Sequence, residues 1–245
     1  MFRCLRENQQ VSWAFVVKTF FNALRPDMHY RREVFSSGLR AVGYVQTDNW
    51  TKCDVFLSWS RYGTRELQAD AVEKRGGQVL IAENATFGND FLGGRWFSLW
   101  SRFHNRSDSI VDGGPSRWGM LGAPLACWRP EGGEIVGLLQ RGIGPRGTPA
   151  NWKPPGCTRL RKHPGKRPSI SLEDDLAKAS EVRTWGSGAA VKALLHGIRV
   201  KSYMPKWCGE QDNTDEGRLS MFERLSWAQW RHEEIAAGVP FAWLL

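Results

Sequence analysis

Residues 182–203 constrain the fold of this chain more than any other stretch. Residues 182–185 favour a short strand, and residues 186–188 (Gly-Ser-Gly) break it. Residues 189–195 form a strong helix candidate, and residues 198–203 are again rich in β-forming side chains. A strand, a glycine turn, a helix and a second strand predict a βαβ unit with parallel strands. In such sheets, ligands bind at the carboxyl ends of the strands.

The glycine turn is a candidate phosphate site. Gly188 lets the backbone approach a ligand closely, and the free N–H groups at the start of the next helix suit an anion. Upstream, Arg161 and His163 lie in a basic segment that Pro164 should keep extended, and both side chains suit a diphosphate. A turn of small residues also serves tight packing alone, so a structural role for residues 186–188 stays open.

Length and composition indicate a globular α/β protein. The chain has 245 residues, 41% of them hydrophobic, which allows one large domain or two ordinary ones. No apolar run is long enough to span a bilayer, and the first residues lack the pattern of a secretory signal. The five cysteines are scattered and form no CxxC pair, which favours reduced thiols and disfavours a structural zinc site.

The charge favours a polyanionic partner. The net charge is +9, and lysine and arginine concentrate between residues 141 and 167. Such asymmetry is typical of nucleic-acid-binding proteins, although solubility alone also explains basic residues. The chain has thirteen tryptophans, some of which could stack on bases or sugar rings while the rest fill the core.

The first part of the chain alternates predicted helices with predicted strands, which indicates a doubly wound α/β layer. The predicted helices are residues 11–24, 33–42 and 66–74, and the predicted strands are residues 53–59 and 78–82. Residues 91–117 are expected to be loop and irregular structure. Their mixture of aromatic and cationic residues could hold an extruded base or a sugar ring, or could plug the core.

Glu83 follows the strand predicted at residues 78–82. A carboxylate at the carboxyl edge of a parallel sheet faces the ligand crevice, where a general base would lie. The alternative is a carboxylate that caps a loop or a helix.

Three units are expected along the chain. Residues 1–130 form an N-terminal α/β lobe, and residues 131–216 form a second α/β lobe that begins with a strand at residues 134–139. A long loop rich in glycine and proline follows that strand. Residues 217–245 are expected to form aromatic helices, the first over residues 218–230, that pack back across the junction of the lobes.

The order of these segments resembles the small GT-B-type glycosyltransferases of bacteriophages, which are similar to capsule polysaccharide transferases and include enzymes that modify DNA bases. The resemblance covers roughly residue 53 to the C-terminus. The segments that carry it are Glu83-Asn84, Arg95-Trp96, His104-Asn105-Arg106, Leu139-Gln140, Arg161-Lys162-His163-Pro164, Glu173-Asp174-Asp175-Leu176-Ala177, Thr184-Trp185-Gly186-Ser187, Trp227-Ala228-Gln229-Trp230 and Glu233-Glu234-Ile235.

The resemblance implies two Rossmann-like lobes facing a cleft, with a nucleotide-sugar co-substrate bound mainly by the second lobe and with no metal and no further cofactor. Glu83 would be the catalytic base. The nucleotide-sugar site would comprise Gln140, Gly142, Arg161, His163, Thr184, Ser187 and Gly188. The acceptor, or DNA, would be held by Arg95, Arg102, Asn105, Arg106, Arg141 and Arg146.

The expected function is therefore transfer of a sugar from a nucleotide-sugar to a hydroxylated acceptor, with a hydroxymethylated base of phage DNA favoured. The expected location is the cytoplasm of an infected bacterium. Two alternatives remain: a polysaccharide or lipid-linked glycan as acceptor, and a non-catalytic, basic nucleic-acid-binding protein on a transferase scaffold.

Overall fold

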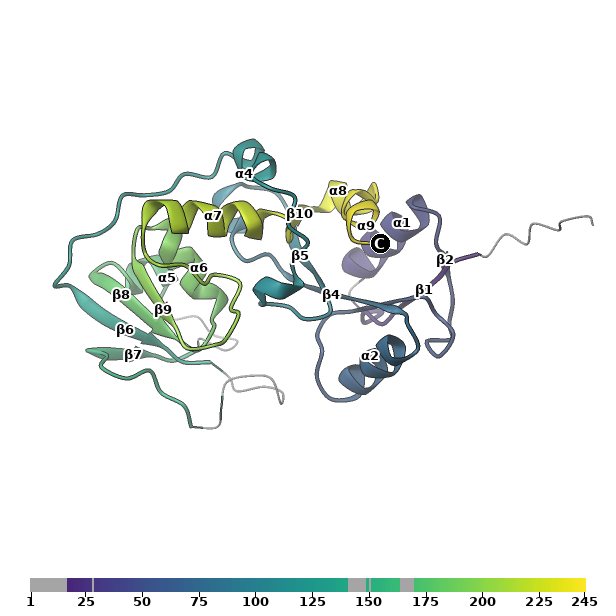
Figure 1. The fold of residues 1–245 in the computed structure, drawn as a ribbon, viewed down its shortest axis with the longest axis horizontal. Helices are drawn as coiled ribbons and strands as arrows, with labels where there is room; N and C mark the ends of the chain where they lie inside the picture. The colour runs from purple at the N-terminus through teal and green to yellow at the C-terminus, as the bar shows by residue number, and fades with distance from the viewer. Residues whose placement is uncertain (1–16, 28, 141–148, 150, 164–169) are drawn as a thin grey trace, which may run out of the picture.

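The structure is a computed structural model that describes residues 17–27, 29–140, 149, 151–163 and 170–245. It contains two β-sheets with helices packed on them, so the predicted α/β class is confirmed. Figure 1 shows the two sheets side by side, with helix α7 (Asp215–Ser226) leading from the four-stranded sheet toward strand β10 (Gln229–Arg231) of the six-stranded one. No helix in the described part of the chain is long and apolar enough to cross a bilayer.

The six-stranded sheet has the order β10-β5-β4-β3-β1-β2. Strands β2, β1, β3 and β4 are mutually parallel, whereas β5 runs antiparallel to β4 and β10 runs antiparallel to β5. The strands are β1 (Thr19–Asn22), β2 (Val45–Gln46), β3 (Val55–Ser58), β4 (Gln78–Asn84), β5 (Trp96–Ser101) and β10 (Gln229–Arg231).

Helices cover both faces of this sheet because its central strands are apolar on both sides. In β3, Phe56 packs in the same hydrophobic cluster as α2 (Thr64–Lys74), while Val55 and Leu57 pack in the cluster that includes α1 (His29–Ala41). Successive side chains of a strand point to opposite faces, so each buried strand needs apolar residues at every position. This arrangement leaves the strand ends as the sites where polar side chains can gather.

The four-stranded sheet is entirely parallel, with the order β7-β6-β8-β9. Its strands are β6 (Glu134–Leu138), β7 (Arg159–Arg161), β8 (Ala179–Thr184) and β9 (Arg199–Ser202), and its crossover helices are α5 (Leu172–Asp175) and α6 (Gly188–Leu195). The βαβ unit predicted at residues 182–203 is therefore confirmed. Ser171 caps the start of α5, because its Oγ accepts a hydrogen bond of 3.0 Å from the Asp174 N–H.

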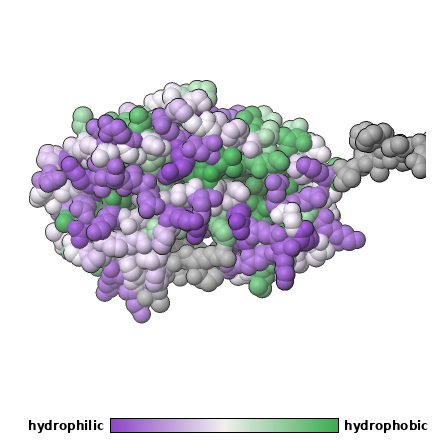
Figure 2. Space-filling model, viewed as in Figure 1, coloured by the Kyte–Doolittle hydropathy of each residue, from purple (hydrophilic) through white to green (hydrophobic). Residues whose placement is uncertain are grey.

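The C-terminal segment returns to the six-stranded sheet. Its elements are α7 (Asp215–Ser226), β10, α8 (His232–Ala236) and α9 (Val239–Leu244). Strand β10 pairs with β5, and α8 and α9 pack against α1. Gly38 of α1 permits this contact, because a Cβ there would lie 1.9 Å from the carbonyl oxygen of Ile235. Figure 2 shows a hydrophobic area over these C-terminal helices, where Val239 and Trp243 are partly exposed.

Three local predictions were wrong. The helix predicted at residues 11–24 is contradicted where the chain is described, because residues 19–22 form strand β1, parallel to both β2 and β3. The stretch of residues 91–117 contains strand β5, the short helix η1 (Ser107–Ser109) and the start of α4 (Ser116–Leu121), and it follows the short helix α3 (Gly88–Phe91). The helix expected to reach residue 230 ends at Ser226, since the following residues form β10. In each case, pairing with a distant strand overrides the local helical or irregular pattern.

Candidate functional site at the facing strand ends

The glycine turn after β8 is a capped helix start. The Thr184 hydroxyl accepts a 3.0 Å hydrogen bond from the Ser187 N–H, and Ser187 Oγ accepts one of 3.2 Å from the Ala189 N–H. Glycine is favoured at position 186, because a Cβ there would lie 2.6 Å from the sulfur and 3.1 Å from the Cβ of Met204, whose side chain would have to shift. Ser187 and Gly188 are only half-buried, so the amino end of α6 is accessible to an anion.

This turn meets the end of β4 on the other sheet. A Cβ on Gly188 would lie 3.9 Å from the Thr86 methyl group, and Thr86 follows β4 by two residues. The Asn105 side-chain amide donates a hydrogen bond to the Gly186 carbonyl. The Thr86 N–H is held in turn by Gln229 Oε1 at 2.7 Å. The carboxyl ends of β4 and β8 therefore face each other, although the two strands belong to different sheets.

A shared hydrophobic core fixes this meeting of the two sheets. A single cluster of buried residues contains Phe56 of the six-stranded sheet and Val182 of the four-stranded sheet. Between them, the Trp118 and Phe222 rings stack with centroids 4.9 Å apart, and Phe87 packs on both. Because these large rings are buried in contact with each other, the two strand ends are held in a defined relation.

Glu83 lies at the carboxyl end of β4, as predicted. Its Oε1 accepts hydrogen bonds from the Asn84 N–H at 2.8 Å and from the Asn84 side-chain amide at 3.1 Å. Burial raises the pKa of Glu83 above its ordinary value, while the Asn84 N–H and the charge of Arg31 oppose the shift. A raised carboxyl pKa makes the ionised form a stronger base, which suits abstraction of a proton from a hydroxyl group.

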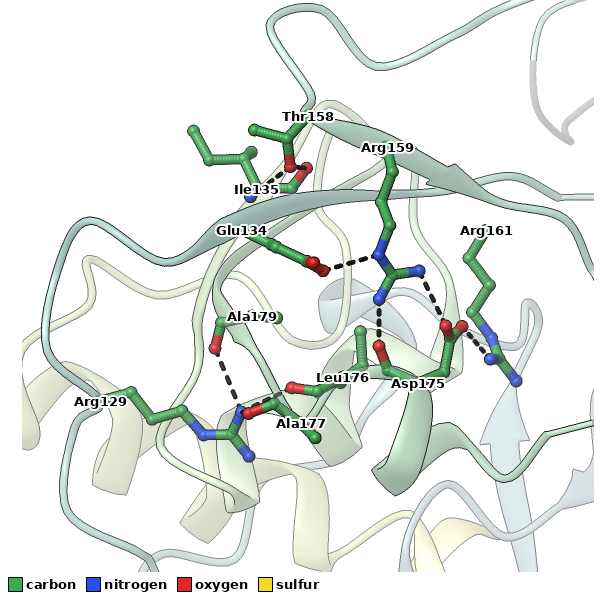
Figure 3. Close-up of polar contacts among 10 residues, drawn as sticks. All are labelled: Arg129, Glu134, Ile135, Thr158, Arg159, Arg161, Asp175, Leu176, Ala177 and Ala179. Atoms are coloured by element: carbon green, nitrogen blue, oxygen red, sulfur yellow. Dashed lines mark hydrogen bonds and ion pairs between the residues drawn. The ribbon is translucent and has the colours of Figure 1, made fainter.

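Arg161 belongs to an ion-pair network around Asp175, the last residue of α5. Figure 3 shows Arg161 and Arg159 converging on the Asp175 carboxylate, with Arg159 also paired with Glu134 at 2.7 Å. Burial opposes ionisation of Asp175, but the hydrogen bond from Arg161 and the charges of both arginines lower its pKa below the ordinary value. The predicted contact of Arg161 with a diphosphate stays a prediction. His163 is exposed, and its predicted contact with a diphosphate stays a prediction.

Two of the arginines predicted to hold the acceptor, Arg102 and Arg106, have acidic partners within the protein. Arg102 pairs with Glu73 at 2.9 Å, although its side chain is 63% exposed. Arg106 pairs with Asp108 through two hydrogen bonds, of 2.8 and 2.7 Å. Asn105 also has a structural role, because it joins its loop to Gly186 and to the backbone of Cys208.

The remaining predicted site residues divide into two groups. Arg95 is exposed beside β5, and Gln140 is half-buried after β6. Gly142, Arg141 and Arg146 lie outside the described residues.

A cavity of about 520 Å³, which was not predicted from the sequence, lies at the carboxyl ends of β1 and β3. Its lining residues are Ala23, Leu24, Arg25, Arg31, Ser58, Trp59, Ser60, Tyr62, Gly63, Thr64 and Arg65. The sequence features that could have indicated this cavity were the strand predicted at residues 53–59 and the polar residues directly after it. Because residues 11–24 were expected to form a helix, strand β1 was not predicted. The loop after β1 was therefore not expected to meet the loop after β3.

The described residues contain no group of three or more His, Cys, Asp or Glu side chains placed to hold a metal ion. No protein-family model matches the sequence, and no curated protein is significantly similar to it.

Proposed function

We propose that this protein is a GT-B-type glycosyltransferase that moves a sugar from a nucleotide-sugar to a hydroxyl group, with a hydroxymethylated DNA base as the favoured acceptor. The proposal rests on one observation: the capped, accessible start of α6 lies across from the end of β4, which carries Glu83. This arrangement supports the proposal, in which a diphosphate binds at the start of α6 and Glu83 acts as the base from the end of β4.

The proposed reaction assigns a task to each side of this junction. Glu83 accepts the proton of the acceptor hydroxyl as its oxygen bonds to the anomeric carbon of the sugar. The bond from that carbon to the diphosphate breaks, and the nucleoside diphosphate leaves with the electron pair. The N–H groups at Ser187 and Gly188 and the dipole of α6 stabilise the charge that grows on the diphosphate, a type of electrostatic help that dominates many enzymes.

Turnover on defined substrates tests this proposal. The assay measures sugar transfer to hydroxymethylated duplex DNA and to unmodified duplex DNA, with a panel of nucleotide-sugars as donors. We expect transfer to the hydroxymethylated duplex alone. Glu83→Gln should lower kcat by roughly 10²- to 10⁴-fold, the usual contribution of a general base.

The matched control is Glu233→Gln, which removes a carboxylate that is 79% exposed on α8 and should leave kcat unchanged. Absence of transfer with every donor, together with absence of nucleotide-sugar binding by calorimetry, would refute the proposal. DNA binding without transfer would favour the non-catalytic alternative instead.

A further inference from the structure

The cavity at the ends of β1 and β3 has the place and the size of a ligand site. It lies where the loops after two adjacent parallel strands separate, between the residues following β1 (Thr19–Asn22) and those following β3 (Val55–Ser58). Ligands bind at this edge in open parallel sheets. Its volume of about 520 Å³ exceeds what an inorganic anion needs and falls in the range of small-molecule pockets.

The described lining of the cavity carries a net positive charge. Arg25 comes from the loop after β1, Arg31 from α1 and Arg65 from α2, and no Asp or Glu is among the described lining residues. Arg65 donates a 2.9 Å hydrogen bond to the neutral Gln68 side chain, and its burial lowers the pKa of its guanidinium. Glu83 is near enough for the charge of Arg31 to affect its pKa, but it lies outside the lining. Guanidinium groups gathered in this way suit a phosphate, which they bind by paired N–H donors.

The start of α2 adds to the positive potential. This helix begins after Gly63, which has a φ of 57° and gives no side-chain cap. Gly63 and Thr64 both line the cavity, so the amino end of an 11-residue helix borders it. The positive end of the helix dipole favours an anion at this place.

Planar groups line the same cavity. The Arg31 guanidinium lies over the Trp59 ring at 4.0 Å from its centroid, and the Phe97 ring packs edge-on against Trp59. Tyr62 is 49% exposed at the cavity wall. Nucleobases stack on aromatic rings and on guanidinium planes, so these side chains provide surfaces for a flat ring beside the phosphate-binding groups.

We propose that this cavity binds a nucleotide unit, with its phosphate held by Arg25 and Arg65 at the start of α2 and its base stacked on Tyr62 or on the Arg31–Trp59 pair. A free nucleoside monophosphate and a nucleotide within a DNA strand present the same chemistry. The site is separate from the Ser187–Gly188 turn, and the proposal does not depend on sugar transfer.

Calorimetry on the full chain at low salt tests this proposal. The probes are the four deoxynucleoside monophosphates, the matching nucleosides, inorganic phosphate and a short single-stranded oligodeoxynucleotide. We expect monophosphates to bind more tightly than either nucleosides or inorganic phosphate. Arg25→Gln and Arg65→Gln should each weaken binding by about 10- to 100-fold, the usual effect of losing a hydrogen bond to a charged group.

Two further variants separate the parts of the site. Tyr62→Ala removes an exposed ring and should reduce the preference for nucleotides over inorganic phosphate. Arg40→Gln is the matched control, because Arg40 lies on α1, the helix that supplies Arg31 to the lining, but is 48% exposed and paired with Glu33 outside the cavity. Arg40→Gln should leave the affinity for monophosphates unchanged, and circular dichroism should show that all variants remain folded.

The two sources of the nucleotide give different results. Tighter binding of the oligodeoxynucleotide, lost in Arg25→Gln and Arg65→Gln, would identify the ligand as a nucleotide of DNA. Equal affinity for monophosphate and oligodeoxynucleotide, with the same losses, would identify a free nucleotide. An affinity that both arginine variants leave unchanged, or the absence of binding by every probe, would overturn the proposal.

Discussion

Replacing Arg117 should strongly destabilise the protein, because this arginine connects α4 to the C-terminal segment from inside the core. Its side chain is 6% exposed. The guanidinium donates to the carbonyls of Ser226 and Gln229 at 2.9 and 2.6 Å and makes two hydrogen bonds of 2.9 Å with the Glu234 carboxylate. It also lies over the Trp230 ring at 3.7 Å.

The expected loss follows from the groups that Arg117→Ala leaves behind. Removing one partner of a buried ion pair costs about 3–5 kcal/mol, and each buried carbonyl left without a donor costs about 1–3 kcal/mol. Glu234 is 28% exposed, so water recovers part of the lost solvation. We therefore expect Arg117→Ala to lower the free energy of unfolding by about 3–4 kcal/mol, near the lower end of the first range.

Urea unfolding followed by tryptophan fluorescence measures this loss. Arg117→Lys keeps the charge but loses the paired donors and the planar stacking, so its loss should be intermediate. The control is Arg40→Ala, whose partly exposed ion pair should contribute at most about 1 kcal/mol. A loss below about 1 kcal/mol for Arg117→Ala would refute the view that this network fastens the C-terminal segment.

Three further predictions concern the fold and the site. Gly38→Ala should lower the free energy of unfolding in urea by about 2–3 kcal/mol, because the new Cβ would overlap the Ile235 carbonyl oxygen at 1.9 Å; wild-type stability would contradict this packing. Ser187→Ala should cost about 1 kcal/mol in the same measurement by removing the cap of α6, and Ser187→Asp should restore it. The folded state raises the pKa of Glu83 and so retains this proton to higher pH than the unfolded state does. The free energy of unfolding of the wild type should therefore fall relative to that of Glu83→Gln as the pH rises above 4.5, the ordinary pKa of a glutamate. Urea unfolding of both proteins over a pH series measures this, and a difference in free energy that does not change with pH would contradict the raised pKa.

Several parts of the site were predictable because their signals are local. The order of strand, Gly-Ser-Gly turn and helix at residues 182–195 needs no distant partner, because glycine, a capping hydroxyl and helix-forming residues act on their immediate neighbours. Glu83 could be placed at a strand end for the same reason, since its strand is a continuous apolar run.

Other features depended on contacts between distant segments. Residues 19–22 have apolar spacing that suits a helix, but they form β1 because the β2 and β3 edges on both sides supply its hydrogen bonds. The sequence around Arg161 does not show whether it pairs with Asp175 or with a ligand, because an arginine can pair with any carboxylate that the fold brings near. The same applies to Arg102 and Glu73.

The sequence alone thus determined the α/β class, the βαβ unit around Ser187 and the position of Glu83 at a strand end, since these follow from residue periodicity and local capping. Tertiary structure alone decided that β10 joins the first sheet, that Arg117 is buried against Glu234, and that the loops after β1 and β3 enclose an electropositive cavity. The physical reason is that such contacts form only when separate apolar faces are buried together, and no single stretch of the chain encodes which faces will meet.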